Sequence, residues 1–341
     1  MRRRLIPALL CALAVAASPA LAQGTPPVVR VGIIGLDTSH SPAFAQLLNA
    51  EDASPELAGF RVTAAYPYGS RTIQSSMTNI PRYTAEVQKV GVEVVGSIAE
   101  LLQRVDVVLL ETNDGQPHLE QALQVMRAGK PLFVDKPIAA SLQDVVAMYD
   151  AARHYRVPIF SASSLRYAAG AQAVRGGSIG RVLGADAFSP ATLEPAHPDL
   201  FWYGIHGVEL LFTAMGTGVE EVSRVHTDST DLVVGRWSDG RLGTFRGTRT
   251  GKHEYGGTAF GEGGNAQLGP YDGYRPLLVE IVKFFRTGTA PVAEAETLEI
   301  YAFMAAADES KRLDGRPVKV AEVLAKARAG AKTRWSASGA P

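Results

Sequence analysis

The pattern of apolar and polar positions differs between the two halves of the chain. In the first half, short apolar runs alternate with longer segments of helical spacing. Apolar runs that lack polar alternation are typical of strands in a parallel sheet with both faces covered. This pattern predicts strands at 28–35, 60–66, 105–112, 131–137 and 157–163.

The segments between these runs predict helices at 42–49, 118–130 and 141–155. Ser39 or Ser41 can cap the first helix, and Gly129 ends the second. Repeated strand–helix alternation predicts a doubly wound parallel sheet of the Rossmann type, an α/β fold. In such sheets ligands bind beyond the carboxyl ends of the strands. The segments expected there are Gly35–His40, Thr112–Asp114, Asp135–Pro137 and Ser161–Arg166.

The second half has a different pattern. A helical segment at 201–216 precedes alternating runs separated by Gly and Asp turns, at 219–227, 230–238, 242–249 and 253–261. Two further helices are expected at 274–288 and 296–313. This order predicts a C-terminal α+β domain with a largely antiparallel open sheet. The expected domains are 23–165 for the Rossmann part and 166–330 for the substrate and oligomerisation part, followed by a flexible tail at 331–341.

The first 22 residues have the pattern of a cleavable secretory signal. A positive start, MRRR, is followed by an apolar core and an Ala-x-Ala sequence that ends at Ala22. The core is too short to span a membrane. Residues 2–6 (RRRLI) also resemble a twin-arginine signal, and a plain secretory signal fits equally well. We therefore expect export to the periplasm or the extracellular space, with loss of Cys11, the single cysteine.

Charge excludes some classes of partner. Lys plus Arg and Asp plus Glu both number 34, so the formal net charge is zero. A balanced chain has no basic field for nucleic acid and no acidic tail for cationic partners. We therefore expect a small-molecule ligand, with neither nucleic acid nor a membrane span.

Three stretches resemble the Gfo/Idh/MocA family, the glucose–fructose oxidoreductase and inositol dehydrogenase group. They are GIIG at 32–35, ETNDGQPHLEQALQVMRAGKPLFVDKP at 111–137, and GIHGVE at 204–209. The resemblance implies an NAD(P)-binding Rossmann domain joined to a domain with an open sheet that often forms homo-oligomers. It also implies hydride transfer at a hydroxyl or keto carbon of a sugar or polyol.

Lys136 and His206 are the expected catalytic residues. Lys136 precedes a proline at a strand end, where its ammonium can stabilise a substrate alkoxide. His206 matches the family's Gly-x-His and is expected to accept the proton. Glu209, one helical turn later, is expected to orient the imidazole ring. The position where many family members carry an Asp, two residues before Gly204, is Trp202, which can stack on a sugar ring.

The resemblance also implies other contacts. His118 is expected near the nicotinamide. Arg166, Trp202 and Tyr203 are expected beside the substrate, although a structural salt bridge is an equal alternative for Arg166. The cofactor-binding set expected overall is Gly35, Asp37, Thr38, Ser39, His40, Ser70, Arg71, Thr112, Asn113, His118, Asp135 and Lys136.

The loop after the first strand departs from the usual Gly-x-Gly-x-x-Gly/Ala pattern. Gly35 fills the first position, whereas Asp37 and His40 stand at the second and third. A carboxylate next to a pyrophosphate is repulsive, although the helix N-terminus behind it can still bind phosphate. Ser70 and Arg71 follow the second strand in place of an acidic residue, which favours NADP slightly over NAD.

Two functional interpretations remain open at this point. In the first, the protein is an exported NAD(P)-dependent oxidoreductase with an altered phosphate loop. In the second, the scaffold has lost ordinary dinucleotide binding, and its polar cleft performs non-redox chemistry on a carbohydrate or only binds it. Metal binding by Asp37, His40 and His206 is a variant of the second interpretation. Because these residues have no metal-ligand spacing, no metal site is expected.

Overall fold

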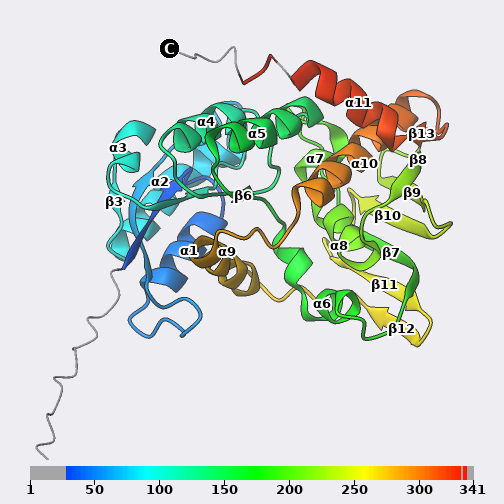
Figure 1. Cartoon of the computed structure of the whole chain (residues 1–341), viewed down its shortest axis with the longest axis horizontal. Helices are drawn as coiled ribbons and strands as arrows, with labels where there is room; N and C mark the ends of the chain where they lie inside the picture. The colour runs from blue at the N-terminus through cyan, green and yellow to red at the C-terminus, as the bar shows by residue number, and fades with distance from the viewer. Residues whose placement is uncertain (1–27, 332, 336–341) are drawn as a thin grey trace, which may run out of the picture.

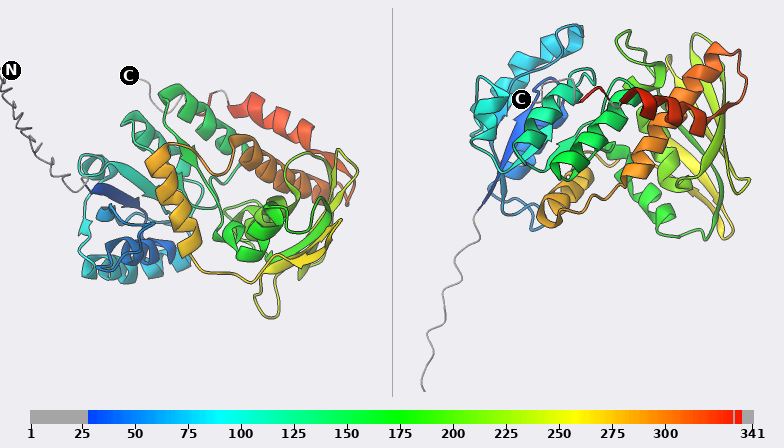
Figure 2. Two further views of the ribbon diagram at one scale, coloured as in Figure 1. Left: turned by 60° about the horizontal axis from the view of Figure 1, so that its bottom comes forward. Right: turned by 45° about the horizontal axis from the view of Figure 1, so that its top comes forward.

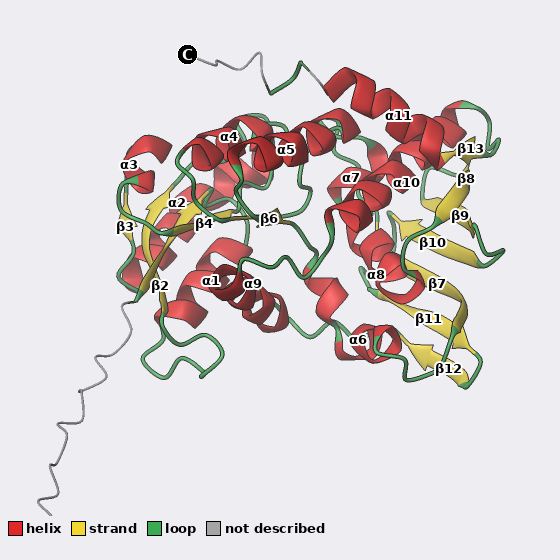
Figure 3. Ribbon diagram, viewed as in Figure 1, coloured by secondary structure: helices red, strands yellow, loops and turns green. Residues whose placement is uncertain are grey.

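The computed structural model describes residues 28–331 and 333–335. Two sheets lie at opposite ends of the molecule, and most helices pack between them or on their faces (Figure 1 and Figure 3). The signal peptide expected at 1–22, with Cys11, lies outside the described residues.

The first sheet is six-stranded and entirely parallel, with the order β3-β2-β1-β4-β5-β6. Its strands are β1 Val29–Ile34, β2 Phe60–Tyr66, β3 Glu93–Val94, β4 Val107–Leu110, β5 Leu132–Val134 and β6 Ile159–Phe160. The predicted doubly wound sheet is therefore confirmed. The strand order reverses between β1 and β4, which is where ligands of such sheets bind.

Helices cover both faces of this sheet. One face packs against α1 His40–Asn49, α2 Gln74–Lys89 and α9 Arg275–Thr287. The other packs against α3 Ile98–Leu102, α4 His118–Arg127 and α5 Leu142–Tyr155. Gly129 ends α4 with a φ of +68°, as expected. Helix α2 and the short elements β3 and α3 are not among the predicted elements.

Helix α9 lies late in the sequence but belongs to the core of the first domain. Its Leu277, Leu278 and Ile281 are fully buried with Val31 and Phe44. Figure 2 shows this helix alongside the first sheet in both views. The first domain is therefore assembled from two separate parts of the chain, 28–165 and the segment around α9.

The second sheet has seven strands in the order β12-β11-β7-β10-β9-β8-β13. They are β7 Val182–Pro190, β8 Val219–His226, β9 Thr230–Trp237, β10 Leu242–Thr248, β11 Gly256–Gly261, β12 Gly264–Gln267 and β13 Val318–Lys319. All neighbours are antiparallel except β7 and β10. This confirms the largely antiparallel second domain.

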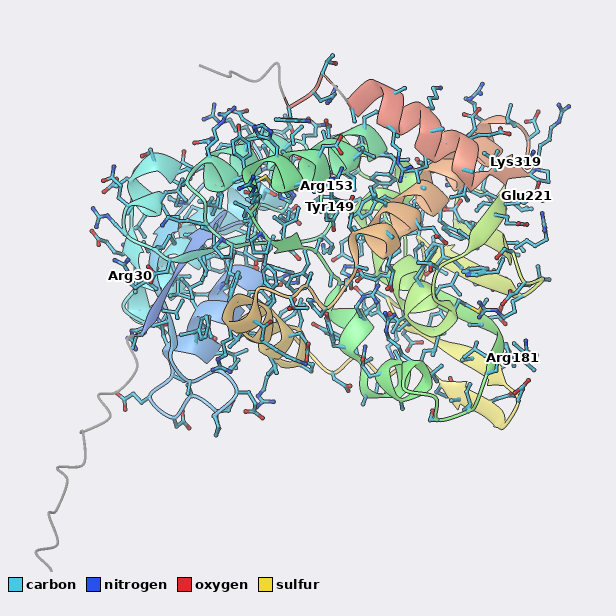
Figure 4. All side chains as sticks on the ribbon, viewed as in Figure 1. Arg30, Tyr149, Arg153, Arg181, Glu221 and Lys319 are labelled. Carbon is cyan, nitrogen blue, oxygen red and sulfur yellow. The ribbon has the colours of Figure 1, made fainter. Side chains whose placement is uncertain are left out.

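Helices α8 Ile205–Met215 and α10 Glu294–Arg312 cover one face of this sheet. The remaining helical elements are η1 Ser164–Tyr167, α6 Ala169–Arg175, α7 Asp199–Trp202 and α11 Val320–Ala331. Figure 4 labels Tyr149 and Arg153 on α5, where the two domains meet, and Arg153 forms an ion pair with Glu294 at the start of α10.

The described part of the expected tail is packed. Arg334 donates to Asp144 of α5, and the Trp335 ring lies 4.9 Å from that of His154. Within the segment expected to be a flexible tail, these two residues thus each have a partner on α5. No helix within 28–331 and 333–335 combines the length and apolar character needed to cross a bilayer.

Candidate active site

A cleft of about 330 Å³ lies between the carboxyl edge of the first sheet and the second domain. Its walls come from the β1–α1 loop, from α2, from the loop after β5, and from η1, α7 and α8. The lining residues are Asp37, Thr38, Ser39, His40, Ser75, Asn79, Tyr83, Asn113, Lys136, Ser164, Leu165, Trp202, Tyr203, His206, Tyr255, Tyr271 and Tyr274. The cleft therefore joins the expected phosphate loop to the expected catalytic residues.

Lys136 and His206 face this cleft from opposite domains. The Lys136 ammonium lies 5.5 Å from the centroid of the Tyr203 ring. The His206 ring lies 5.5 Å from the same ring and meets it edge-on. Tyr203 thus contacts both groups, which places an ammonium and an imidazole at one point of the cleft.

Ser163 holds the imidazole of His206. The two side chains meet at 2.7 Å through Nδ1 and Oγ, so Nε2 is the nitrogen available to the cleft. Burial, together with the positive charges of Lys136 and His40, lowers the pKa of His206 well below its ordinary value. The ring is therefore neutral at pH 7 and can accept a proton through Nε2 when Nδ1–H donates to Ser163.

The expected orientation of His206 by Glu209 is corrected by the structure. Glu209 accepts from the backbone N–H of Ser163 at 2.7 Å and from Arg166 Nε at 2.7 Å. It acts on His206 only indirectly, by fixing the residue that holds the ring. Sequence spacing identified the correct helix face but not the intervening serine.

Arg166 does not contact the cleft. Its side chain is 2% exposed and pairs with Glu209 and, at 2.7 Å, with Glu296. Although burial opposes it, these two carboxylates raise the pKa of the guanidinium above its ordinary value. The expected substrate contact is therefore wrong, and the structural salt bridge is the correct alternative.

His118 is also structural. It is fully buried, and its Nε2 lies 2.6 Å from the carbonyl oxygen of Thr112 and its Nδ1 3.3 Å from that of Ile138. Burial lowers its pKa. The ring therefore joins the end of β4 to the loop after β5 and does not reach a nicotinamide from this position. Thr112 is equally buried behind the cleft.

The β1–α1 loop retains the first glycine for a physical reason. Gly35 has a φ of +95°, and a Cβ there would stand 2.4 Å from the Thr112 backbone nitrogen. Thr38 and the exposed Ser39 at the start of α1 line the cleft. Ser39 makes no side-chain cap and instead meets the Tyr274 hydroxyl at 2.8 Å. The N-terminus of α1 therefore faces the cleft, as phosphate binding requires.

Asp37 bridges two neighbouring loops. Its carboxylate accepts from the backbone N–H groups of Ser70 at 3.0 Å and Asn113 at 2.9 Å. Burial raises its pKa to about 6. Two backbone amides therefore hold this carboxylate in place, and its raised pKa lessens the negative charge that it presents to a phosphate near pH 6. The residues of the loop therefore fit a diphosphate at the start of α1.

The residues expected to select NADP do not support that choice. Ser70 is 2% exposed and donates its hydroxyl to Asp114 at 2.7 Å. The guanidinium of Arg71 lies over the Tyr68 ring, 5.9 Å from its centroid. The hydroxyl of Ser70 is already used within the protein. It therefore gives no support to the expected preference for NADP over NAD.

His40 and Asp135 meet below the cleft. The His40 Nδ1 lies 2.9 Å from Asp135 Oδ2 and 3.7 Å from Glu111 Oε2. Although burial opposes it, these carboxylates raise the pKa of His40 to about 9. Burial and the neighbouring Asp135 raise the pKa of Glu111 to about 7. Asp135 is fully buried within this cluster. It therefore contacts His40 and not, as expected, a cofactor.

Aromatic side chains form much of the remaining cleft wall. Trp202 lines it and packs on the His197 ring, with centroids 4.9 Å apart. Tyr255, Tyr271 and Tyr274 also line it and were missed from sequence. They follow glycine turns in the second half of the chain, where the pattern offered no sign that the loops turn towards the first domain.

Comparison with known proteins directly supports the assignment of the first domain as an NAD-binding Rossmann domain. Residues 29–163 match a family model described as an oxidoreductase family with an NAD-binding Rossmann fold, Gfo/Idh/MocA. A curated relative, 1,5-anhydro-D-fructose reductase of Ensifer adhaerens, is 34% identical over 134 residues. That match covers 37% of this chain and 40% of the length of the relative.

Solved structures support the fold of both domains. The scyllo-inositol dehydrogenase of Lactobacillus casei, with NAD(H) and scyllo-inositol bound, superposes with a TM-score of 0.66 and 16% identity. The myo-inositol 2-dehydrogenase of Lactobacillus plantarum superposes with a TM-score of 0.68 and 16% sequence identity. Both matches cover 86% of this chain and 99% of the other. The first domain therefore matches the Gfo/Idh/MocA oxidoreductase family over residues 29–163, and the fold of the chain is similar to that of these inositol dehydrogenases.

Proposed function

We propose that the protein is an NAD(P)-dependent oxidoreductase acting on a hydroxyl or keto carbon of a sugar or polyol. The observation that carries this proposal is the placement of Lys136 and His206 in one cleft that begins at the N-terminus of α1. The match of residues 29–163 to an NAD-binding oxidoreductase family and the similarity to a curated reductase support the same reaction class.

The protein's own groups supply acid–base chemistry. Lys136 stabilises negative charge on the substrate oxygen, and His206 Nε2 takes the hydroxyl proton. Tyr203 and Trp202 contact the ring or chain of the substrate. When bound, the nicotinamide supplies the hydride acceptor or donor. Thr38 and Ser39 would hold the phosphates of the dinucleotide.

Dinucleotide binding is the direct test. Titration with NAD⁺ and NADP⁺ by calorimetry and thermal unfolding is expected to show binding, with about 2.7 kcal/mol of stabilisation at a hundredfold excess over Kd. Ser39→Asp adds a carboxylate at the start of α1 and is expected to weaken binding about tenfold. Thr78→Asp, exposed on α2 and outside the cleft, is the matched control.

One observation favours a second candidate function. Asp37 and His40, at the second and third glycine positions, join the loops after β2, β4 and β5 across the crevice. In this alternative, Lys136 and His206 perform non-redox chemistry on a carbohydrate. Absence of binding of either dinucleotide at millimolar concentration would select it and reject the first proposal.

The pH dependence of the reaction follows from His206. Its lowered pKa means that the proton-accepting neutral form persists below pH 6.5. We expect kcat/KM for oxidation to decline with acidity only at a pH below that value, measured from pH 4.5 to 9. If instead kcat/KM fell to half of its maximum at or above pH 6.5 on acidification, this would contradict His206 as the proton acceptor.

We further propose that the chain is exported and forms a homo-oligomer. Export rests on the sequence of residues 1–22. Oligomerisation is supported by the uncovered face of the second sheet, which carries large exposed apolar side chains from four strands. These are Leu183, Phe188, Val225, Leu242 and Phe260.

A further inference from the structure

Three ligand-type side chains converge beneath the cleft, each from a different part of the first sheet. His40 is the first residue of α1, Glu111 follows β4 and Asp135 follows β5. One nitrogen or oxygen atom of each lies within 4.8 Å of those of the other two. Strand order alone brings these positions together, since β1, β4 and β5 are neighbours.

The polar atoms of this cluster lack hydrogen-bond partners. Glu111 and Asp135 are fully buried, and both carboxylate oxygens of each have no hydrogen-bond partner within the described part of the chain. The same holds for His40 Nδ1, although it lies 2.9 Å from Asp135. The imidazole and the carboxylate are therefore close but not aligned on each other.

This combination is unusual for a folded protein. Buried polar groups are almost always hydrogen-bonded, and a buried carboxylate without a partner is costly. The two carboxylates share one nearby cation, the His40 imidazole at 2.9 Å from Asp135 and 3.7 Å from Glu111, and their four oxygens without hydrogen bonds leave room for a second positive partner. Lys136 is adjacent in sequence, but its ammonium is directed towards the Tyr203 ring in the cleft.

The spacing of the donor atoms suits a metal ion. Adjacent ligands of an octahedral ion at about 2.1 Å are about 3.0 Å apart, and His40 and Asp135 are 2.9 Å apart. One imidazole with two carboxylates is a donor set for first-row transition ions rather than Ca²⁺. We propose that His40, Glu111 and Asp135 bind one divalent transition-metal ion beneath the cleft.

This proposal goes beyond the oxidoreductase function and does not depend on it. The ion would connect the start of α1 to the ends of β4 and β5, next to the cleft that His40 lines. It uses two residues, Glu111 and Asp135, that the cleft itself does not expose. It also differs from the trio of Asp37, His40 and His206 considered from sequence, because Asp37 and His206 have other partners.

The test uses the whole mature protein, treated with EDTA, dialysed and titrated with MnCl₂. Electron paramagnetic resonance is expected to show one bound Mn²⁺ per chain, and thermal unfolding a rise in Tm of about 5 °C at saturating Mn²⁺. A crystal soaked in MnCl₂ is expected to give an anomalous peak among the three side chains.

The variant Glu111→Gln distinguishes whether Glu111 is a metal ligand or a structural carboxylate. We expect it to weaken Mn²⁺ binding at least tenfold while the Tm in EDTA stays equal or rises, because one unpaired buried charge is removed. Asp114→Asn, at the same sheet edge but outside the trio, is expected to bind Mn²⁺ like the wild type.

Two results would overturn the proposal. One is a wild-type protein that binds neither Mn²⁺ nor Zn²⁺ at 1 mM (roughly the weak end of protein metal sites), whatever the behaviour of the variants. The other is Mn²⁺ bound with unchanged affinity by Glu111→Gln. The first result would show that the protonated His40 alone balances the two acids, and the second that Mn²⁺ binds without Glu111. Neither would affect the dinucleotide titration that tests the enzymatic proposal.

Discussion

Replacing Lys136 by methionine is expected to lower kcat by a factor of about 10² to 10³. Methionine keeps most of the length and apolar stem of lysine but removes the ammonium that stabilises charge on the substrate oxygen. Loss of one such group costs about 2.7–4 kcal/mol in the transition state. The measurement is steady-state oxidation of the best sugar or polyol substrate under saturating dinucleotide.

The matched control for this experiment is Lys130→Met. Lys130 precedes β5 at the opposite end of that strand and does not line the cleft. It should leave kcat unchanged. Wild-type turnover in Lys136→Met would remove Lys136 from the mechanism, and a comparable loss in both variants would attribute the effect to folding.

Replacing Arg166 by methionine is expected to destabilise the fold by about 3–5 kcal/mol. The guanidinium is buried between Glu209 and Glu296. Removing it leaves Glu209 buried without its cationic partner, whereas Glu296 keeps Arg175 at 2.9 Å. Breaking a buried pair by removing one partner is costly for this reason. The midpoint of urea unfolding at pH 7 measures the change.

An exposed ion pair provides the control. Arg181 and Glu262 meet at 3.0 Å with side chains 67% and 56% exposed, and Figure 4 labels Arg181 at the surface. Arg181→Met should change stability by about 0–1 kcal/mol. In addition, Glu209→Gln combined with Arg166→Met should recover part of the loss. Equal effects of Arg166→Met and Arg181→Met would show that burial of the Arg166 pair is unimportant.

The parts of the fold that were predicted correctly have strong apolar patterns. The strands at 28–35 and 105–112 contain the apolar runs Val31–Ile34 and Val107–Leu110, which are buried because both faces of the sheet are covered. Helix α2 was missed because only three of its residues are buried and Pro81 lies within it, so its apolar face is weak. Strand β7 was missed for a related reason, since Gly184 and two alanines replace the large apolar residues that mark a strand.

The candidate site was predicted in part. Lys136, Trp202, Tyr203 and His206 do line one cleft. By contrast, the polar partners of Asp37, His118, Arg166 and Glu209 could not be inferred, because most of those partners are distant in sequence. Asn113 lies 76 positions from Asp37, and Glu296 lies 130 from Arg166. A single sequence shows which groups are polar but not where their hydrogen bonds are made.

The late position of α9 in the chain has a consequence for biosynthesis. During translation, residues 28–165 emerge well before α9, yet Val31, Phe44 and Phe160 share one buried cluster with Leu277, Ile281 and Phe284 of that helix. The whole second sheet apart from its last strand is synthesised before that helix exists. The amino-terminal half therefore leaves the ribosome as an incomplete folding unit, and the nascent chain reaches its native core only near the end of its synthesis.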